Sequence, residues 1–153
     1  MKKMIFFAWA VIAFCACSKS NSGSTTPSGS TTWTLNGVNY TAAVTGYNDT
    51  STGLGILLAT DVKGDFISII FFSHPAANGQ YVVTSDGTGQ ANGCQIQVAV
   101  YSGGVSQIYT STGKTGDMVT VTIKNGKLTA ACTGVTVAYN NTNATVSGTV
   151  VQP

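Results

Sequence analysis

Two of the four Asn-Gly pairs in this chain lie between stretches of alternating apolar and polar residues, and these two constrain its fold more than any other feature of the sequence. Asn-Gly is the strongest short-range signal for a two-residue β-hairpin turn, because both turn residues need a positive φ. A turn at Asn125-Gly126 in "MVTVTIKNGKLTAAC" gathers the apolar side chains on one face. The pairs are Ile123 with Leu128, Val121 with Ala130 and Val119 with Cys132, while Thr122 and Thr129 pair on the other face. A slip by one residue would turn the apolar face outward, so the pattern fixes the register.

Two more stretches predict hairpins in the same way. A turn at Asn36-Gly37 in "WTLNGVNYTA" pairs Leu35 with Val38 and Trp33 with Tyr40, so that the bulky apolar residues share one face. In "LGILLATDVKGDFISIIFFS" we expect a turn at Lys63-Gly64. It would pair Leu58 with Ile69, Ile56 with Phe71 and, on the reverse face, Leu57 with Ile70. Both faces of this hairpin are apolar, so we expect it to be covered on both sides or to expose an apolar patch.

The remaining alternation predicts an all-β domain. Further strands are expected at 81–85, 94–101, 106–110, 135–139 and 145–151. The apolar parity changes across Thr133-Gly134, which indicates a β-bulge or a bend. Nine or ten short strands without a helical period predict an antiparallel meander closed as a β-sandwich or a β-barrel.

The first residues, "MKKMIFFAWAVIAFCAC", have the layout of a secretory signal peptide: two lysines, a short apolar run and then small residues. The alternative, a transmembrane anchor, needs about 20 apolar residues, and this run is shorter.

The cysteine that ends the apolar run resembles the lipobox of bacterial lipoproteins. In that family the cysteine receives a diacylglycerol and becomes the first residue of the mature chain. Cys17 fits because the small Ala16 precedes it, whereas Cys15 follows the bulky Phe14. The alternative is an ordinary signal peptide with incidental cysteines. The resemblance implies a signal peptide at 1–16 and membrane attachment through a covalent lipid on Cys17.

A Ser/Thr/Gly-rich stretch follows Cys17 and predicts a flexible tether at 17–31, which leaves a single β-domain at 32–153. By the sorting rules of bacterial lipoproteins, Ser18 in place of an aspartate implies the outer membrane. The tether has no acidic cluster of the kind that directs some lipoproteins to the cell surface, so the periplasmic face is favoured. The domain also resembles the small β-rich lipoproteins of unknown function from Gram-negative bacteria, in "WTLNGVNYTA", "FISIIFF" and "GVTVAYNNTNATVSGTV". That resemblance supports the architecture and transfers no functional residue.

The charge of the mature chain argues against nucleic-acid binding. The full chain has a formal net charge of +2, but Lys2 and Lys3 lie in the predicted signal peptide, and the other five lysines balance five aspartates. The sequence contains no arginine and no glutamate. A nucleic-acid-binding surface needs an excess of positive charge, so we expect no nucleic-acid partner.

Two cysteines remain in the domain, Cys94 and Cys132, and alternation places both on core faces. Thiols of exported proteins meet an oxidising compartment, so we predict a disulfide between them. It would contribute about 4 kcal/mol in the chain-entropy model. The alternative is two separate buried thiols that pack as small hydrophobic side chains.

No catalytic, cofactor-binding or metal-binding set is predicted. His74 is the single histidine; Ser73 is adjacent but should point to the opposite side, so a solvated loop histidine is the favoured interpretation. Asp86 and Asn92 do not have the spacing of a known calcium loop. One weak signal for a ligand surface is a set of tyrosines near loops that could stack on sugars: Tyr47, Tyr101 and Tyr109.

These observations lead to two hypotheses. The first is a lipid-anchored envelope protein whose non-enzymatic β-domain binds or presents a glycan, a small apolar molecule or another envelope protein. The alternative is a hydrolase of envelope polymers, which would gain support if His74 shared a cleft with an aspartate. Within the first hypothesis, a barrel with a lined cavity would indicate a carrier and a filled sandwich would indicate contact between surfaces.

Overall fold

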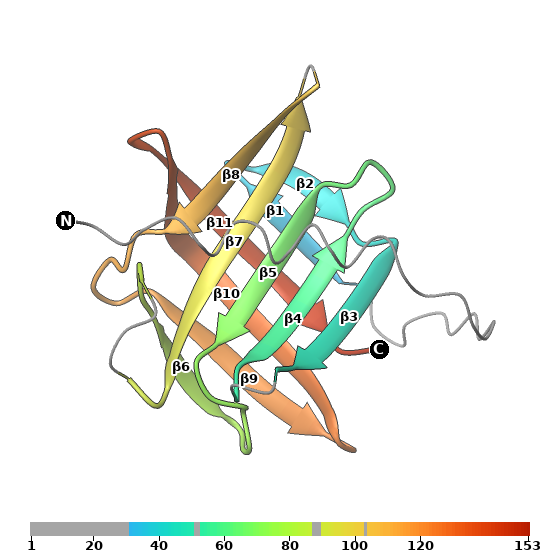
Figure 1. Ribbon diagram of the computed structural model, residues 1–153, viewed down its shortest axis with the longest axis vertical. Helices are drawn as coiled ribbons and strands as arrows, with labels where there is room; N and C mark the ends of the chain where they lie inside the picture. The colour runs from blue at the N-terminus through green and yellow to red at the C-terminus, as the bar shows by residue number, and fades with distance from the viewer. Residues whose placement is uncertain (1–30, 51–52, 87–89, 103) are drawn as a thin grey trace.

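The computed structural model describes residues 31–50, 53–86, 90–102 and 104–153 (Figure 1). The signal peptide predicted at 1–16, the predicted lipid attachment site Cys17 and the rest of the predicted tether up to residue 30 lie outside the described residues. Thr31 already belongs to the domain: its side chain is buried and its hydroxyl accepts the Val151 N–H at 2.9 Å. None of the described residues forms a helix that is long and apolar enough to cross a membrane.

The described chain forms eleven strands. They are β1 (Thr32–Leu35), β2 (Val38–Thr41), β3 (Val44–Asp49), β4 (Gly55–Thr60), β5 (Phe66–Phe71), β6 (Gly79–Val83), β7 (Gly93–Ser102), β8 (Val105–Ser111), β9 (Met118–Lys124), β10 (Lys127–Tyr139) and β11 (Thr142–Val151). The all-β prediction is therefore confirmed.

The strands form two layers that face each other. The order β3-β4-β5-β7-β8 makes the front layer of Figure 1, and β2-β1-β11-β10-β9-β6 makes the rear layer, whose strands cross those of the front at a steep angle. Pairing of β6 with β7 and of β8 with β10 joins the layers into one continuous sheet. The result is compatible with either the sandwich or the barrel-like arrangement that the alternation predicts.

The purely antiparallel meander is wrong in two respects: some neighbouring strands are not consecutive in the chain, as in β1–β11 and β6–β9, and one pair is parallel. β6 and β7 pair in parallel, with Val82 opposite Gly93 and Val83 opposite Cys94. Their connection brings the chain back beside the end of β6 instead of reversing it in a tight hairpin. The sheet is therefore mixed.

Both Asn-Gly hairpins have the predicted register. Trp33 faces Tyr40, and all four predicted pairs of the β9–β10 hairpin are present. Asn36 and Asn125 have φ values of 49° and 53°, as the turn type requires. Leu35 also faces Val38 as predicted, but Val38 is 57% exposed, because it lies beside the turn on the edge strand β2, beyond the reach of the core.

The predicted irregularity at Thr133-Gly134 is a β-bulge within one long strand. The register of β10 against β11 shifts between Cys132 and Val135, and the Gly134 N–H donates to the Ser147 hydroxyl at 2.8 Å. Since the bulge inserts one extra residue, the apolar parity changes while the same face stays buried. The stretches on its two sides are therefore parts of one strand.

The predicted register of the β4–β5 hairpin is wrong by one residue. Leu57 pairs with Ile69 and Ile56 with Ile70, because the connection is a loop from Asp61 to Asp65 and not a two-residue turn at Lys63-Gly64. The Asp61 carboxylate organises this loop by accepting the N–H groups of Lys63 at 2.7 Å and Asp65 at 3.0 Å. Such local side-chain bonds favour turns over a tighter hairpin.

The space between the layers is filled with side chains. The largest of those that are almost fully buried are Trp33, Leu57, Ile67, Ile69, Phe71, Val83, Ile96, Val98, Val119, Val121, Val135 and Val137. They come from both layers, so in the described part of the chain packed side chains fill the space between the layers.

Candidate functional site

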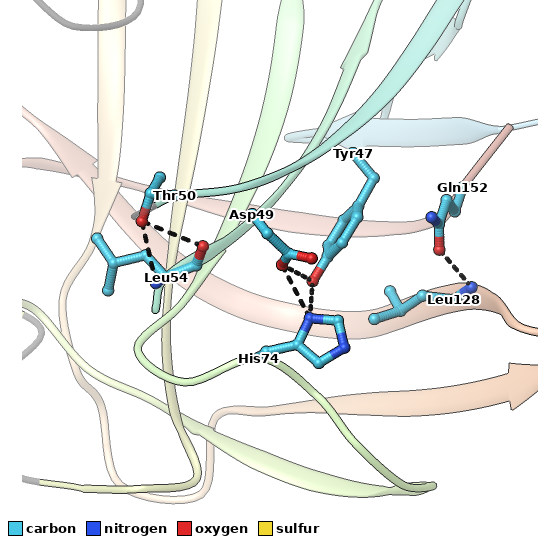
Figure 2. Close-up of polar contacts among 7 residues, drawn as sticks. All are labelled: Tyr47, Asp49, Thr50, Leu54, His74, Leu128 and Gln152. Atoms are coloured by element: carbon cyan, nitrogen blue, oxygen red, sulfur yellow. Dashed lines mark hydrogen bonds and ion pairs between the residues drawn. The ribbon is translucent and has the colours of Figure 1, made fainter. Parts of the chain in front are cut away.

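One polar cluster joins the end of β3 to the segment after β5: Tyr47, Asp49 and His74 (Figure 2). His74 Nδ1 lies 2.8 Å from Asp49 Oδ1 and 2.7 Å from the Tyr47 hydroxyl, and that hydroxyl lies 2.8 Å from Asp49 Oδ1. Two neighbouring side chains of β3 thus meet a histidine that lies 25 residues beyond Asp49 in the sequence, at one end of the front layer.

The local sequence explains how β3 contributes two of the three groups. Tyr47 and Asp49 are two residues apart on a strand, so both side chains lie on the same face. The chain turns after β3 through Thr50, whose hydroxyl accepts the Leu54 N–H at 3.1 Å (Figure 2). β4 then begins at Gly55, directly opposite Asp49.

Gly55 makes room for the Tyr47 hydroxyl. A Cβ atom at position 55 would lie 2.6 Å from this oxygen, closer than non-bonded atoms approach. The same Cβ would lie 3.4 Å from Pro75, which follows His74 and is buried. Gly55 is therefore the position at which the strand and the His74 segment come together.

Hydrogen bonds and charge define the protonation pattern of the cluster. The Tyr47 hydroxyl donates to the Asp49 carboxylate, and the Nδ1–H tautomer of His74 donates to the same carboxylate. The bond from His74 is the largest influence on the pKa of Asp49 and lowers it, with a smaller contribution from Tyr47. The pKa of Tyr47 is raised, first by burial and then by its bond to Asp49. His74 and Asp49 are 53% and 55% exposed, so the pair meets solvent.

Gly55→Ala should break this cluster. The new methyl group would displace the Tyr47 hydroxyl from Asp49, so we expect the pKa of Tyr47 to fall and that of Asp49 to rise. NMR titration of both side chains measures the two changes. Gly46→Ala is the matched control, because a Cβ at position 46 would meet no atom within 4 Å. Unchanged titration of Tyr47 in Gly55→Ala would show that the glycine is not required.

An open recess lies beside His74, with a volume of about 430 Å³. Its lining comes from the segment after β5, the start of β6 and the residues before β7: Ser73, His74, Ala76, Ala77, Asn78, Gly79, Gln80, Tyr81, Ala91 and Asn92. Two of its polar side chains are already engaged, since the Ser73 hydroxyl donates to the Ala91 backbone carbonyl and the side-chain Oδ1 of Asn78 accepts the Ile123 N–H. Among the described residues, the carboxamides of Gln80 and Asn92 and the Nε2 atom of His74 have no hydrogen-bond partner.

The cluster contains part of a catalytic arrangement. An imidazole oriented by a carboxylate through Nδ1 leaves Nε2 available as a base. Nucleophilic catalysis also needs a hydroxyl or thiol at Nε2, and within the described ranges the neighbouring Ser73 hydroxyl bonds to a carbonyl instead. The described part of the chain also holds no group of three or more metal-ligating side chains.

The three tyrosines that predicted a stacking platform do not lie together. Tyr47 belongs to the cluster, Tyr109 packs against Tyr139 with ring centroids 5.6 Å apart, and Tyr101 lies beside Gly64 at the other end of the front layer. Nothing in the sequence pairs Asp49 with His74. Strand β3 is not predicted either, because "VTGYND" lacks alternating apolar residues and has a glycine at its centre.

Both domain cysteines are buried free thiols, so the predicted bond between Cys94 and Cys132 is not formed in this structure. Its formation in an oxidising compartment stays a prediction. Burial raises the pKa of Cys94 to about 12, with a further contribution from the charge of Cys132. Burial also raises the pKa of Cys132, to about 11.

The chain was compared with protein-family models, with curated proteins and with solved structures, and none of the three comparisons gave a significant match.

Proposed function

We propose that this protein is a lipid-anchored envelope protein whose non-enzymatic β-domain binds a glycan in the recess beside His74. Cys17 carries the anchor, and the tether holds the domain near the membrane. One observation carries the ligand assignment: the recess is lined by two carboxamides and an imidazole edge that have no partner among the described residues.

The chemistry of these groups suits a neutral saccharide. A sugar hydroxyl both donates and accepts hydrogen bonds, and a carboxamide offers both functions in one planar group. No lysine lines the recess; its ionisable groups are His74, which is paired with Asp49, and the phenol of Tyr81, whose pKa is raised by burial. A strongly anionic ligand would therefore find little charge compensation there.

The packed core argues against the hypothesis that the domain carries a small apolar molecule in its interior. Large side chains from both layers fill the space that a carrier would need for its ligand. Binding at the surface is then the mode that fits this domain.

A hydrolase of envelope polymers is the second candidate, and the Asp49–His74 pair is the specific observation in its favour. It would use His74 Nε2 as a base towards water or a bound hydroxyl. Release of reducing ends from a bound glycan, lost in His74→Ala, would support it. Binding without turnover would support the non-enzymatic proposal.

The double substitution Gln80→Ala/Asn92→Ala tests the recess. We expect at least a tenfold loss of binding on a glycan array, because both carboxamides would lose their bonds to the sugar. Asn143→Ala is the matched control, as it removes an exposed amide from the opposite end of the domain. Equal binding by the wild-type protein and the double variant would contradict the assignment of the recess.

Cys17→Ser tests the anchor. A serine hydroxyl cannot receive the thioether-linked lipid, so the variant should move from the detergent phase to the aqueous phase in phase partitioning. Cys15→Ser is the control and should stay in the detergent phase. Unchanged partitioning of Cys17→Ser would refute the anchor.

A further inference from the structure

One end of the front layer carries a row of residues on its outer face that are apolar except for Thr60, and of these Ala99 is fully buried. Strand pairing places Val44 beside Thr60, Thr60 beside Phe66, Phe66 beside Ala99 and Ala99 beside Ile108. The row thus crosses all five strands of the layer. Val44 is 66% exposed, and Phe66 is half-buried. Of the reverse face predicted for the β4–β5 hairpin, Leu57 is fully buried in the core, whereas Ile70 lies on the outer face and is half-buried.

Two loop tips extend this row beyond the strands. Val62, in the loop between β4 and β5, is 87% exposed, and Val105 is exposed at the turn between β7 and β8. Tyr101 connects the two tips, because its exposed ring lies beside Gly64 of the first loop. We call Val44, Val62, Phe66, Tyr101, Val105 and Ile108 the apolar end.

The apolar end holds most of the exposed apolar side chains of the domain. Among the described residues six large hydrophobic side chains are exposed, and five of them belong to it, while the sixth, Val38, lies on the rear layer. Scattered exposed apolar residues are ordinary, but a gathering at one end marks an interaction surface.

The charges at this end are arranged with the acidic groups inward. The Asp65 side chain is buried, and its carboxylate accepts the Tyr101 N–H at 2.6 Å. The Asp61 carboxylate accepts N–H groups of its own loop. Lys63 is exposed at the tip between them. The exposed ammonium of Lys63 can therefore meet lipid phosphates, while the two carboxylates bond within the domain, and the attraction to a bilayer comes mainly from the apolar side chains.

The chain that precedes the described residues joins the domain near the same end. The Thr31 carbonyl accepts the Ala42 N–H at 3.0 Å, and the next residue, Ala43, donates to the Thr60 carbonyl at 2.8 Å. Val44 follows directly and opens the apolar row. The segment that leads back to Cys17 therefore starts beside the edge of the apolar end.

We propose that the apolar end is a membrane-contact surface, which lays the domain against the bilayer that holds the lipid of Cys17. This inference rests on the proposed anchor. The valines and Tyr101 would enter the headgroup region, while Lys63 would meet lipid phosphates. His74 and its recess follow the opposite end of β5, so they would face away from the bilayer and stay open to a glycan (Figure 1).

Fluorophore labelling of the full lipidated protein tests this orientation. Single substitutions Val62→Cys and Val105→Cys place an environment-sensitive dye on the two tips, and Val38→Cys is the matched control on the rear layer. All three side chains are exposed, so the fold should be kept, and the native thiols of Cys94 and Cys132 are buried from the reagent. The protein is reconstituted into phosphatidylethanolamine–phosphatidylglycerol vesicles that contain a spin-labelled quencher lipid.

We expect at least threefold stronger quenching at Val62 and Val105 than at Val38. Equal quenching at the three positions in protein that floats with the vesicles would overturn the membrane-contact surface and leave the anchor intact. Crosslinks between copies through Val62→Cys, with no lipid quenching, would overturn it in favour of a contact between two copies. Protein that does not float with the vesicles would refute the anchor itself, and the inference with it.

Discussion

Gly148→Ala should destabilise the domain by about 3 kcal/mol, because position 148 has no room for a methyl group. A Cβ atom there would lie 2.7 Å from the Thr32 carbonyl oxygen and 2.7 Å from the Trp33 Cβ. Gly148 pairs with Trp33 on one side and with Cys132 on the other. The clash involves backbone, so it cannot be relieved by a rotamer change and must separate β1 from β11.

Urea unfolding measures this effect, with Gly46→Ala as the control. Gly46 also lies within a strand, but a Cβ there would have nothing within 4 Å. We expect its free energy of unfolding to change by less than about 1 kcal/mol. Equal stability of the two variants would contradict the close approach of β1 and β11.

Stability should fall steeply at alkaline pH as long as Cys94 and Cys132 are free thiols. Burial raises the pKa of Cys94 from 9.0 to about 12 and that of Cys132 from 9.0 to about 11. The folded state therefore keeps these protons at pH values where the unfolded state releases them. Stability is complete below pH 9 and is lost as pH rises towards the folded-state pKa values. By about pH 10.5 each thiol should lower the free energy of unfolding by about 2 kcal/mol.

Unfolding at pH 8 and pH 10.5 separates this effect from other causes. The variant Cys94→Ala/Cys132→Ala loses the same packing at both pH values. Between pH 8 and pH 10.5 its free energy of unfolding should therefore fall by about 4 kcal/mol less than that of the wild-type protein. Equal pH dependence of the two proteins would contradict free buried thiols. A mass increase of two protons on reduction would then identify the disulfide that the sequence predicts.

Most of the fold could be predicted from turn chemistry and alternation. Asn36-Gly37 and Asn125-Gly126 impose one turn geometry, and the apolar parity beside them allows one register. The bulge at Gly134 was visible as a change of parity. The predicted register was wrong where local side-chain bonds lengthened a loop, as at Asp61. Strand β3 was not predicted, because its burial is too shallow to require apolar residues.

The candidate site was less predictable than the fold. His74 was visible as the single histidine, but its partner Asp49 is set by the pairing of β3 with β4 and by the room left at Gly55. Neither the strand pairing nor the room at Gly55 can be read from "GYNDT", because this stretch has the composition of an ordinary turn. Alternation likewise placed Cys94 and Cys132 in the core but could not tell which strands are neighbours.

Native mass spectrometry of the full-length protein, extracted from its own envelope in mild detergent, tests the central proposal most directly. We expect a covalent lipid on Cys17 together with an additional saccharide mass that leaves on denaturation and is absent from Gln80→Ala/Asn92→Ala. A folded domain that carries the covalent lipid and no further mass, in the wild-type protein as in the variant, would contradict glycan binding in the recess beside His74.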